Sequence, residues 1–107
     1  MDDWQLLDAY ATRNSEEAFR ALVDRYTGLV YHAALQRTGR PHTAEEIPQA
    51  VFTALAWKAD RISKSTVLSG WLFQATRFAA LNLAREEARR KLATATGSHG
   101  IILTWPH

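Results

Sequence analysis

The chain has 107 residues, of which 47% are hydrophobic and 22% are charged, a balance that predicts one globular domain and excludes wholesale disorder. It contains no cysteine, which excludes disulfides and thiolate metal sites and favours an intracellular protein. The acidic first residues lack an apolar signal-peptide segment, and no apolar run approaches the roughly 20 residues that span a bilayer. We therefore expect a cytoplasmic protein without a membrane span.

The net charge is only +2, but the charges are unevenly distributed along the chain. From Lys58 onward the acidic residues are Asp60, Glu86 and Glu87. The basic residues of the same stretch are Lys58, Arg61, Lys64, Arg77, Arg85, Arg89, Arg90 and Lys91. This asymmetry predicts a positive field over the second half of the chain that attracts phosphate groups.

Two helices are expected in the first part of the chain. The first covers about residues 2–11, where apolar residues recur at helical spacing, and a turn over residues 12–15 follows it. The second starts at Asn14 or Ser15, because Asn14 and Glu17 resemble a capping box. Its apolar period runs from Phe19 to Ala34 and includes Leu29, and it ends at Gly39-Arg40-Pro41.

A third helix is expected to open at Thr43, because Thr43 and Glu46 form the pattern of a capping box. Core spacing follows at Ile47, Val51, Phe52 and Leu55. Pro48 falls about five residues into this helix, where it is expected to cost one backbone hydrogen bond or to bend the first turn.

A loop rich in Lys and Ser is expected over residues 61–68, followed by a fourth helix from about Ser69 to Lys91. The inner face of this helix is expected to comprise Trp71, Leu72, Ala75, Phe78, Ala79, Asn82 and Leu83. Beyond Leu92 the period fails, so residues 93–107, with the apolar patch at residues 101–103, are interpreted as a linker or a loosely packed, disordered tail. The fold class predicted for residues 1–92 is therefore all-α, a compact bundle of about four helices.

The residues that carry catalysis or hold metals are not found in recognisable arrangements. The four histidines are scattered, and none forms a helical metal-ligand pair. The sequence also lacks the P-loop and GxGxxG motifs that bind phosphates and the GxSxG motif that carries a nucleophilic serine. Glu45 and Glu46 are adjacent, and neighbouring helix positions face different directions. We therefore expect no enzyme, no cofactor and no metal site.

Three motifs resemble those of a known family. Residues 43–55, TAEEIPQAVFTAL, resemble the acidic AEDLxQEVF stretch of bacterial sigma factors. Residues 70–85, GWLFQATRFAALNLAR, resemble the WLxxIAxNxAxDxxR helix that follows it. The LLDAY of residues 6–10 and the EAF of residues 17–19 resemble the start of the same family. Over about residues 2–91 the chain is therefore similar to region 2 of an extracytoplasmic-function (group IV) sigma factor.

The chain also departs from the family pattern. Ala50 stands where the family usually has Glu, Pro48 where an aliphatic residue or Thr is usual, and Ala84 near a common Asp. Region 4, the domain that reads the −35 element, is absent from the sequence, so we expect either a truncated chain or a naturally short protein.

The resemblance implies two partners, the β′ subunit of the RNA polymerase core and the −10 element of promoter DNA, mainly as separated non-template strand. The third helix is implied to bind the β′ clamp helices through Glu45, Glu46, Gln49 and Phe52. The loop and the fourth helix are implied to bind DNA through Lys58, Arg61, Ser63, Lys64, Ser65, Trp71, Gln74, Arg77, Arg85 and Arg89.

Structural roles compete with each of these assignments. In the structural alternative, Glu46 is no more than a capping partner and Glu45 no more than a favourable acidic residue at a helix N-terminus. The Lys/Ser loop is then a solvated connector. Trp71 and Trp57 can stack on a base or lie in the core, and the arginines that end the fourth helix complement its dipole.

Two other functions therefore stay open. The first is a protein-interaction module of the same fold that binds an anti-sigma factor or the polymerase without DNA recognition. The second is a generic helical DNA-binding domain. The promoter sequence, the stimulus, any anti-sigma partner and the oligomeric state are left undetermined by the sequence.

Overall fold

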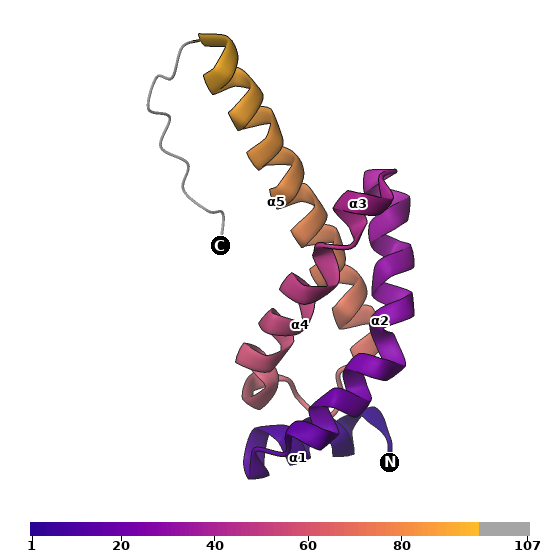
Figure 1. Cartoon of the computed structure of the whole chain (residues 1–107). Coiled ribbons are helices and arrows are strands. Elements are labelled where there is room, and N and C mark those ends of the chain that lie inside the picture. The colour runs from indigo at the N-terminus through magenta and orange to yellow at the C-terminus, as the bar shows by residue number, and fades with distance from the viewer. Residues whose placement is uncertain (97–107) are drawn as a thin grey trace.

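A computed structural model describes residues 1–96, with side chains as far as residue 93. The helices are α1 (Asp3–Arg13), α2 (Glu16–Thr38), α3 (Pro41–Ala44), α4 (Ile47–Lys58) and α5 (Leu68–Thr96), and a 3-10 turn, η1 (Ala59–Arg61), follows α4 (Figure 1). No strand occurs within residues 1–96. The predicted all-α fold is confirmed, with four long helices and one additional helical turn. The expected tail continues into residues 97–107, which lie outside the described residues.

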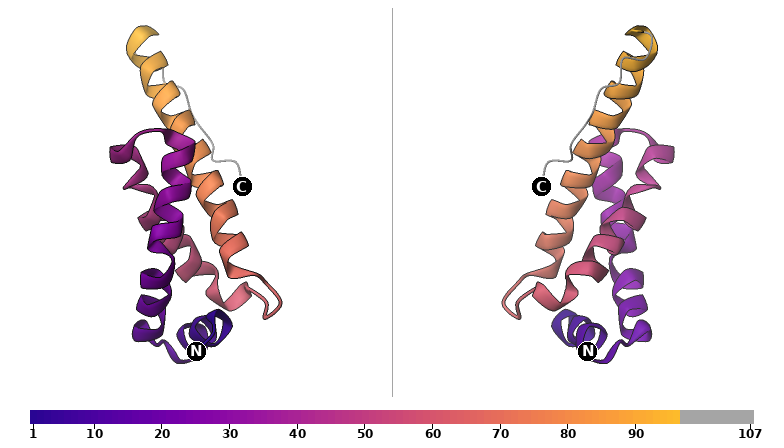
Figure 2. Two further views of the ribbon diagram at one scale, coloured as in Figure 1. Left: turned by 90° about the vertical axis from the view of Figure 1, so that its right-hand side faces the viewer. Right: turned by 90° about the vertical axis from the view of Figure 1, so that its left-hand side faces the viewer.

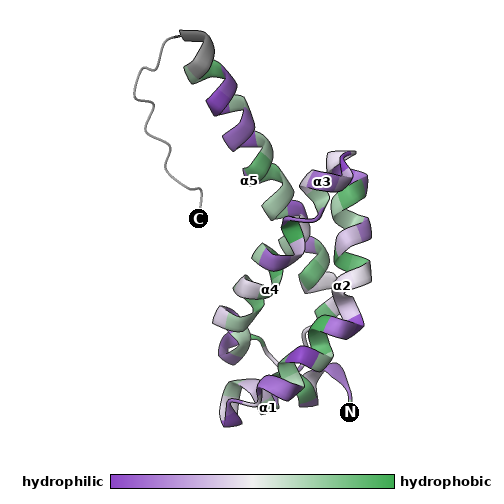
Figure 3. Ribbon diagram, viewed as in Figure 1, coloured by the Kyte–Doolittle hydropathy of each residue, from purple (hydrophilic) through white to green (hydrophobic). Residues whose placement is uncertain are grey.

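The bundle is built on α2, α4 and α5, which pack against one another in pairs. The first helix, α1, lies across the end of this group and contacts both α2 and η1 (Figure 2). In α5, hydrophobic residues dominate the N-terminal half and hydrophilic residues gather in the C-terminal half (Figure 3). The packed part of α5 is therefore its N-terminal half, and its C-terminal half carries the charge.

The hydrophobic core lies between α2, α4 and α5. Its fully buried side chains include Leu22, Val30, Val51, Leu55 and Leu72, which come from all three helices. Thr76 is also fully buried, and its hydroxyl donates to the carbonyl of Leu72 at 2.7 Å. This bond removes the cost of a buried hydroxyl without a partner. The core positions expected in the third helix are all buried, as predicted.

The boundary between α1 and α2 differs from the expectation. Asn14 adopts a left-handed conformation with φ of 58° and ends α1, a position that Asn tolerates better than most residues. Ser15, not Asn14, caps α2, since its hydroxyl accepts the N–H of Ala18 at 3.2 Å. The predicted capping box at Asn14 is therefore wrong, and α1 continues two residues past Ala11.

The expected third helix is divided in two. After Gly39 ends α2 with φ of 69°, α3 is a single turn, and Glu45 and Glu46 form a turn between α3 and α4. Pro48 then lies in the first turn of α4, where its missing N–H costs no helical hydrogen bond. The predicted capping box of Thr43 and Glu46 is therefore wrong, because proline begins a helix here and does not interrupt one.

Two further expectations about α5 and the core are wrong. The helix starts at Leu68 and continues to Thr96. It therefore does not end near Lys91, and the first residues of the expected tail, 93–96, are helical. Leu29 and Phe78, both expected in the core, are 41% and 48% exposed. Each fits the apolar period, but α2 and α5 have more apolar positions than their neighbouring helices cover.

Candidate nucleic-acid interface

The candidate residues of α3 and α4 surround a shallow hollow at the N-terminal end of α4. Glu45, Glu46 and Gln49 line it together with His42 and Ala50, and its volume is about 440 Å³. The turn between α3 and α4 exposes both carboxylates, and neither has a side-chain hydrogen bond at the start of α4. We call this surface the acidic hollow. It offers carboxylate and amide oxygens to basic and polar groups of a partner.

Phe52 does not join the acidic hollow. It is only 6% exposed and belongs to the core, although its edge lines a separate hollow between α2 and α4. Trp57 lines the same hollow and is 81% exposed. The spacing of Trp57 allowed either a core or a surface position, and no feature of the sequence distinguished the two. This tryptophan is the most exposed of the large aromatic side chains among the described residues.

The basic residues before α5 lie at the other end of α4. Lys58 is the last residue of α4, Arg61 ends η1, and both are exposed. The loop that follows is held by hydroxyl groups, since the Ser63 hydroxyl lies 3.0 Å from that of Ser65 and 3.1 Å from that of Thr66. We call the predicted set of Lys58, Arg61, Ser63, Lys64 and Ser65 the basic loop. Its hydroxyls and cations are exposed to solvent and suit phosphate oxygens.

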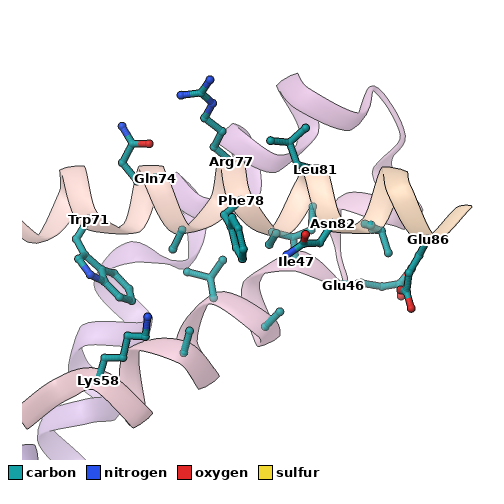
Figure 4. A pocket seen from close by; sticks show the side chains of 16 residues that line it. Glu46, Ile47, Lys58, Trp71, Gln74, Arg77, Phe78, Leu81, Asn82 and Glu86 are labelled. Carbon is teal, nitrogen blue, oxygen red and sulfur yellow. The ribbon is translucent and has the colours of Figure 1, made fainter. Parts of the chain in front are cut away.

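The outer side of α5 carries the next group of predicted residues. One side of the helix holds Gln74, Arg77 and Arg85. With a rotation of about 100° per residue, the three fall within a sector of about 80° around the helix axis. All three are exposed. Figure 4 shows the side chains of Gln74 and Arg77 pointing away from α4. Arg89 differs, because its guanidinium lies 3.6 Å from the Glu86 carboxylate.

The predicted DNA-binding residues are therefore spread over a long surface. Gln74 and Arg77 lie in the half of α5 that follows the basic loop. Arg89 lies about 18 Å further along the helix than Arg77, at about 1.5 Å per residue. The structure gathers one group near the basic loop and leaves Arg85 and Arg89 as a second, separate group.

A groove of about 1100 Å³ lies between α4 and α5. Lys58 and Trp71 face each other at one end of it, and Glu46 and Glu86 lie together at the other (Figure 4). Trp71 is half-buried and packs against the core, which agrees with the core position that the sequence left open for it and keeps part of its ring exposed. Phe78 extends into the groove between the two ends (Figure 4).

Charge differs between the two ends of α4, whose 12 residues extend over about 18 Å at about 1.5 Å per residue. Glu45 and Glu46 lie in the turn before the helix. At the other end, Lys58, Arg61 and Lys64 outnumber the single carboxylate of Asp60. Surfaces of opposite sign at this separation suit two partners of different charge.

Two features were not found within residues 1–96: a metal-ligand cluster and a membrane-spanning helix. No cluster of three or more His, Asp or Glu side chains there is arranged to hold a metal ion. Among the helices of the same residues, none has the length and the apolar content that a bilayer crossing requires.

The family model for sigma-70 region 2 matches residues 22–90 of the chain. The chain belongs to the sigma-70 region 2 family. No curated protein and no solved structure matches the chain. The family is a non-catalytic domain of transcription initiation factors, and it acts in promoter recognition.

Membership of the sigma-70 region 2 family implies interaction with the RNA polymerase core and with promoter DNA. The matched segment begins within α2 and ends within α5. It therefore contains the acidic hollow, the basic loop and the outer side of α5, whereas α1 lies outside it.

Proposed function

We propose that this chain is region 2 of a bacterial extracytoplasmic-function (group IV) sigma factor. In this proposal the acidic hollow binds the β′ clamp helices, and the basic loop with α5 binds the −10 element. The observation that carries the proposal is the separation of charge along α4, which lies within the segment that matches the family. One end suits a basic protein surface, and the other suits a polyanion.

At the acidic hollow, Glu45 and Glu46 accept hydrogen bonds from basic groups of β′, and Gln49 supplies both a donor and an acceptor. Ala50 contributes no carboxylate, so the contact depends on the residues around it. Phe52 acts from the core by holding α4 in place, because its side chain exposes too little area for a large contact.

At the basic loop, Lys58, Arg61 and Lys64 bind phosphates of the non-template strand. Ser63 and Ser65 offer hydroxyls to the polar edges of an unstacked base, and Trp71 offers an aromatic face for stacking. These contacts favour DNA whose strands have separated, since paired bases do not expose their stacking faces.

Along α5, Gln74 pairs with an adenine edge and Arg77 with a guanine or a phosphate. Arg85 and Arg89 lie farther along the helix and bind phosphates of the duplex upstream of the separated region. The ion pair of Arg89 with Glu86 is exposed and weak, so phosphate replaces the carboxylate at small cost.

The first experiment tests the polymerase contact by a pull-down of purified RNA polymerase core. The variant Glu46→Lys/Gln49→Ala is expected to lose binding, because it reverses one charge and removes one amide in the acidic hollow. The matched control Glu16→Lys/Gln36→Ala changes the same residue types at exposed positions of α2 and is expected to bind as the original chain does. Equal binding by the two variants would refute the assignment of this surface.

The second experiment tests DNA recognition in the presence of core polymerase. Single-stranded non-template DNA of the −10 region is compared with a scrambled strand by fluorescence anisotropy. Arg61→Glu/Lys64→Glu is expected to abolish binding, and the exposed pair Arg13→Glu/Arg20→Glu to retain it. A failure of the unmodified chain to prefer the promoter strand argues against promoter recognition.

A second candidate function is protein interaction without DNA recognition, through an anti-sigma factor or the polymerase alone. The exposed Trp57 beside an apolar hollow favours it, because exposed aromatic residues beside a pocket are common at protein interfaces. In that case Arg61→Glu/Lys64→Glu leaves protein binding and biological activity intact.

A further inference from the structure

One side of α5 carries a row of residues spaced alternately by three and four positions. They are Trp71, Gln74, Phe78, Leu81, Arg85 and Ala88. This alternation keeps the residues on one side of a helix, and with mainly apolar members it is the pattern by which one helix packs along another. We call these six residues the α5 seam.

The apolar members of the α5 seam lie at the surface. Phe78 is 48% and Leu81 47% exposed, Ala88 is exposed, and Trp71 is half-buried. Figure 4 shows Trp71 and Phe78 on the side of α5 next to α4, with Gln74 and Leu81 on the opposite side. Ala88 follows Trp71 by 17 residues, which is about 26 Å at about 1.5 Å per residue. The seam therefore offers two rows of side chains between which those of a second helix fit.

The polar members of the seam distinguish between two orientations of a second copy of the chain. In a parallel pair each seam residue faces its own counterpart, so Arg85 faces Arg85 and the two cations repel each other. In an antiparallel pair Phe78 faces Leu81 of the second copy. Arg85 then faces Gln74, because Gln74 precedes Phe78 and Arg85 follows Leu81 by the same four residues. The amide oxygen of Gln74 accepts a hydrogen bond from the guanidinium in that arrangement.

The charges at the two ends of the groove between α4 and α5 favour the same orientation. Lys58 lies at the end next to Trp71, and Glu46 and Glu86 lie at the other end (Figure 4). An antiparallel copy reverses the two ends, so that Lys58 of each chain faces the carboxylates of the other, twice by symmetry. A surface whose charges complement themselves after a two-fold rotation fits a second copy better than a partner of uniform charge.

We propose that the α5 seam binds the same seam of a second copy, antiparallel and around a two-fold axis between Phe78 and Leu81. Burial of the apolar members supplies most of the free energy of association, and the exposed charges, which contribute little affinity, fix the orientation. The proposal does not depend on the proposed function. If both hold, the dimer covers Trp71, Gln74 and Arg85 and competes with −10 DNA.

The first test is sedimentation equilibrium of the full chain at concentrations up to about 1 mM. Leu81→Asp is expected to raise the dissociation constant of the dimer at least about tenfold, because it places a carboxylate at the centre of the contact. The matched control is Leu29→Asp, which changes a leucine of α2 that is 41% exposed and should leave dimerisation unchanged. Circular dichroism checks that both variants are folded. An original chain that stays monomeric throughout, or equal dissociation constants for the two variants, overturns the proposal.

The second test reverses charges at the ends of the groove. Lys58→Glu and Glu46→Lys are each expected to weaken the dimer by about threefold to tenfold at low salt, because each places like charges opposite one another at both ends. An equimolar mixture of the two variants should recover the original affinity as a heterodimer, since both reversed contacts become attractive. A mixture that dimerises no better than either variant alone contradicts antiparallel pairing.

The absence of cysteine from the sequence allows a third test of orientation by disulfide formation. Gln74→Cys and Arg85→Cys face each other only in the antiparallel dimer. A mixture of the two variants is therefore expected to cross-link mainly between unlike chains, and each variant alone should cross-link slowly. Efficient cross-linking of Arg85→Cys with itself indicates parallel pairing and refutes the proposed arrangement.

Discussion

Lys58 and Trp71 face each other across one end of the groove between α4 and α5 (Figure 4). One contributes a cation and the other an aromatic face, and they come from two helices joined by the basic loop. Under the proposed function, this pairing would place a group for phosphate beside a group for a base.

Trp71→Ala is expected to weaken binding of single-stranded −10 DNA by about 1–3 kcal/mol, the usual loss when one stacking platform is removed. Trp71→Phe is expected to retain most of the affinity, since it keeps an aromatic face. Because Trp71 also packs against the core, urea unfolding must show that the variants are folded under the conditions of the titration. Equal affinities for the Ala and Phe variants would exclude stacking at this position.

Lys64→Ala is expected to change the salt dependence of DNA binding. The slope of log K against log salt should decrease in magnitude by about 0.7, the contribution of one phosphate contact on a single strand. Arg13→Ala removes an exposed cation from the end of α1 and should leave the slope unchanged. An unchanged slope for Lys64→Ala means that this lysine does not contact a phosphate.

Trp57→Ala is expected to weaken protein binding while leaving the stability of the fold nearly unchanged. Trp57 is 81% exposed, so its loss should change the free energy of unfolding by no more than about 0.5 kcal/mol. If the second candidate function holds and the polymerase uses the hollow between α2 and α4, affinity for the polymerase core is expected to fall by about 2 kcal/mol or more, as for an aromatic hot spot. Val67→Ala, at an apolar position that is 71% exposed, is the control for a general loss of surface hydrophobicity. A Trp57→Ala variant that binds the core with unchanged affinity shows that the hollow between α2 and α4 is not used by the polymerase.

Two leucines of α2 test the core assignment. Leu22 is fully buried and Leu29 is 41% exposed. Leu22→Ala is expected to lower the free energy of unfolding by about 2–5 kcal/mol, because it removes apolar contacts and leaves a cavity. Leu29→Ala should cost much less, since its side chain is already partly in water. Chemical denaturation of both variants checks the difference, and similar losses would contradict the orientation of α2.

Tyr26 gives a prediction on pH. Its hydroxyl donates to the Asp3 carboxylate, and burial, followed by this hydrogen bond, raises the pKa of Tyr26 above the ordinary value of 10.0. The folded state therefore holds this proton at a pH where the unfolded state has begun to release it. The stabilisation is fully present below about pH 10 and is lost as the pH rises through the folded-state pKa.

Tyr26→Phe is accordingly expected to cost about 1 kcal/mol near neutral pH, the net value of one hydrogen bond. The difference from the original chain should shrink above pH 10, because only the tyrosine can ionise. Urea unfolding at pH 7 and pH 10.5 measures both values. A difference that stays constant or grows with pH contradicts the role of this proton.

The sequence predicted the helices well where the apolar period and the turn residues agreed. The buried positions of α4 follow from spacing alone, because Ile47, Val51 and Leu55 recur at one side of a helix. The start of α4 was mispredicted, since Thr43 and Glu46 match a capping pattern although a new helix begins at Ile47, with Pro48 in its first turn. Local patterns compete at such a junction, and tertiary packing selects between them.

The residues of the candidate site stay a prediction from the resemblance, and the structure shows only how they are arranged. The resemblance supplied Glu45, Glu46 and Gln49, and the structure brings these three together. Exposure could not be read from the sequence, because Trp57 and Phe78 occupy positions that fit an apolar stripe. Which of those positions a neighbouring helix covers depends on how the helices cross, and residue spacing does not encode that angle.

The contact between α1 and η1 has a consequence for the order of folding. The pairing of α1 with α2 joins neighbouring segments and costs little loop-closure entropy. The pairing of α1 with η1 joins segments roughly 50 residues apart, which makes it one of the costly contacts to form. We expect α1 to reach η1 only after α2, α4 and α5 have assembled. The support beneath the basic loop is then completed late, by a helix that the family match does not include.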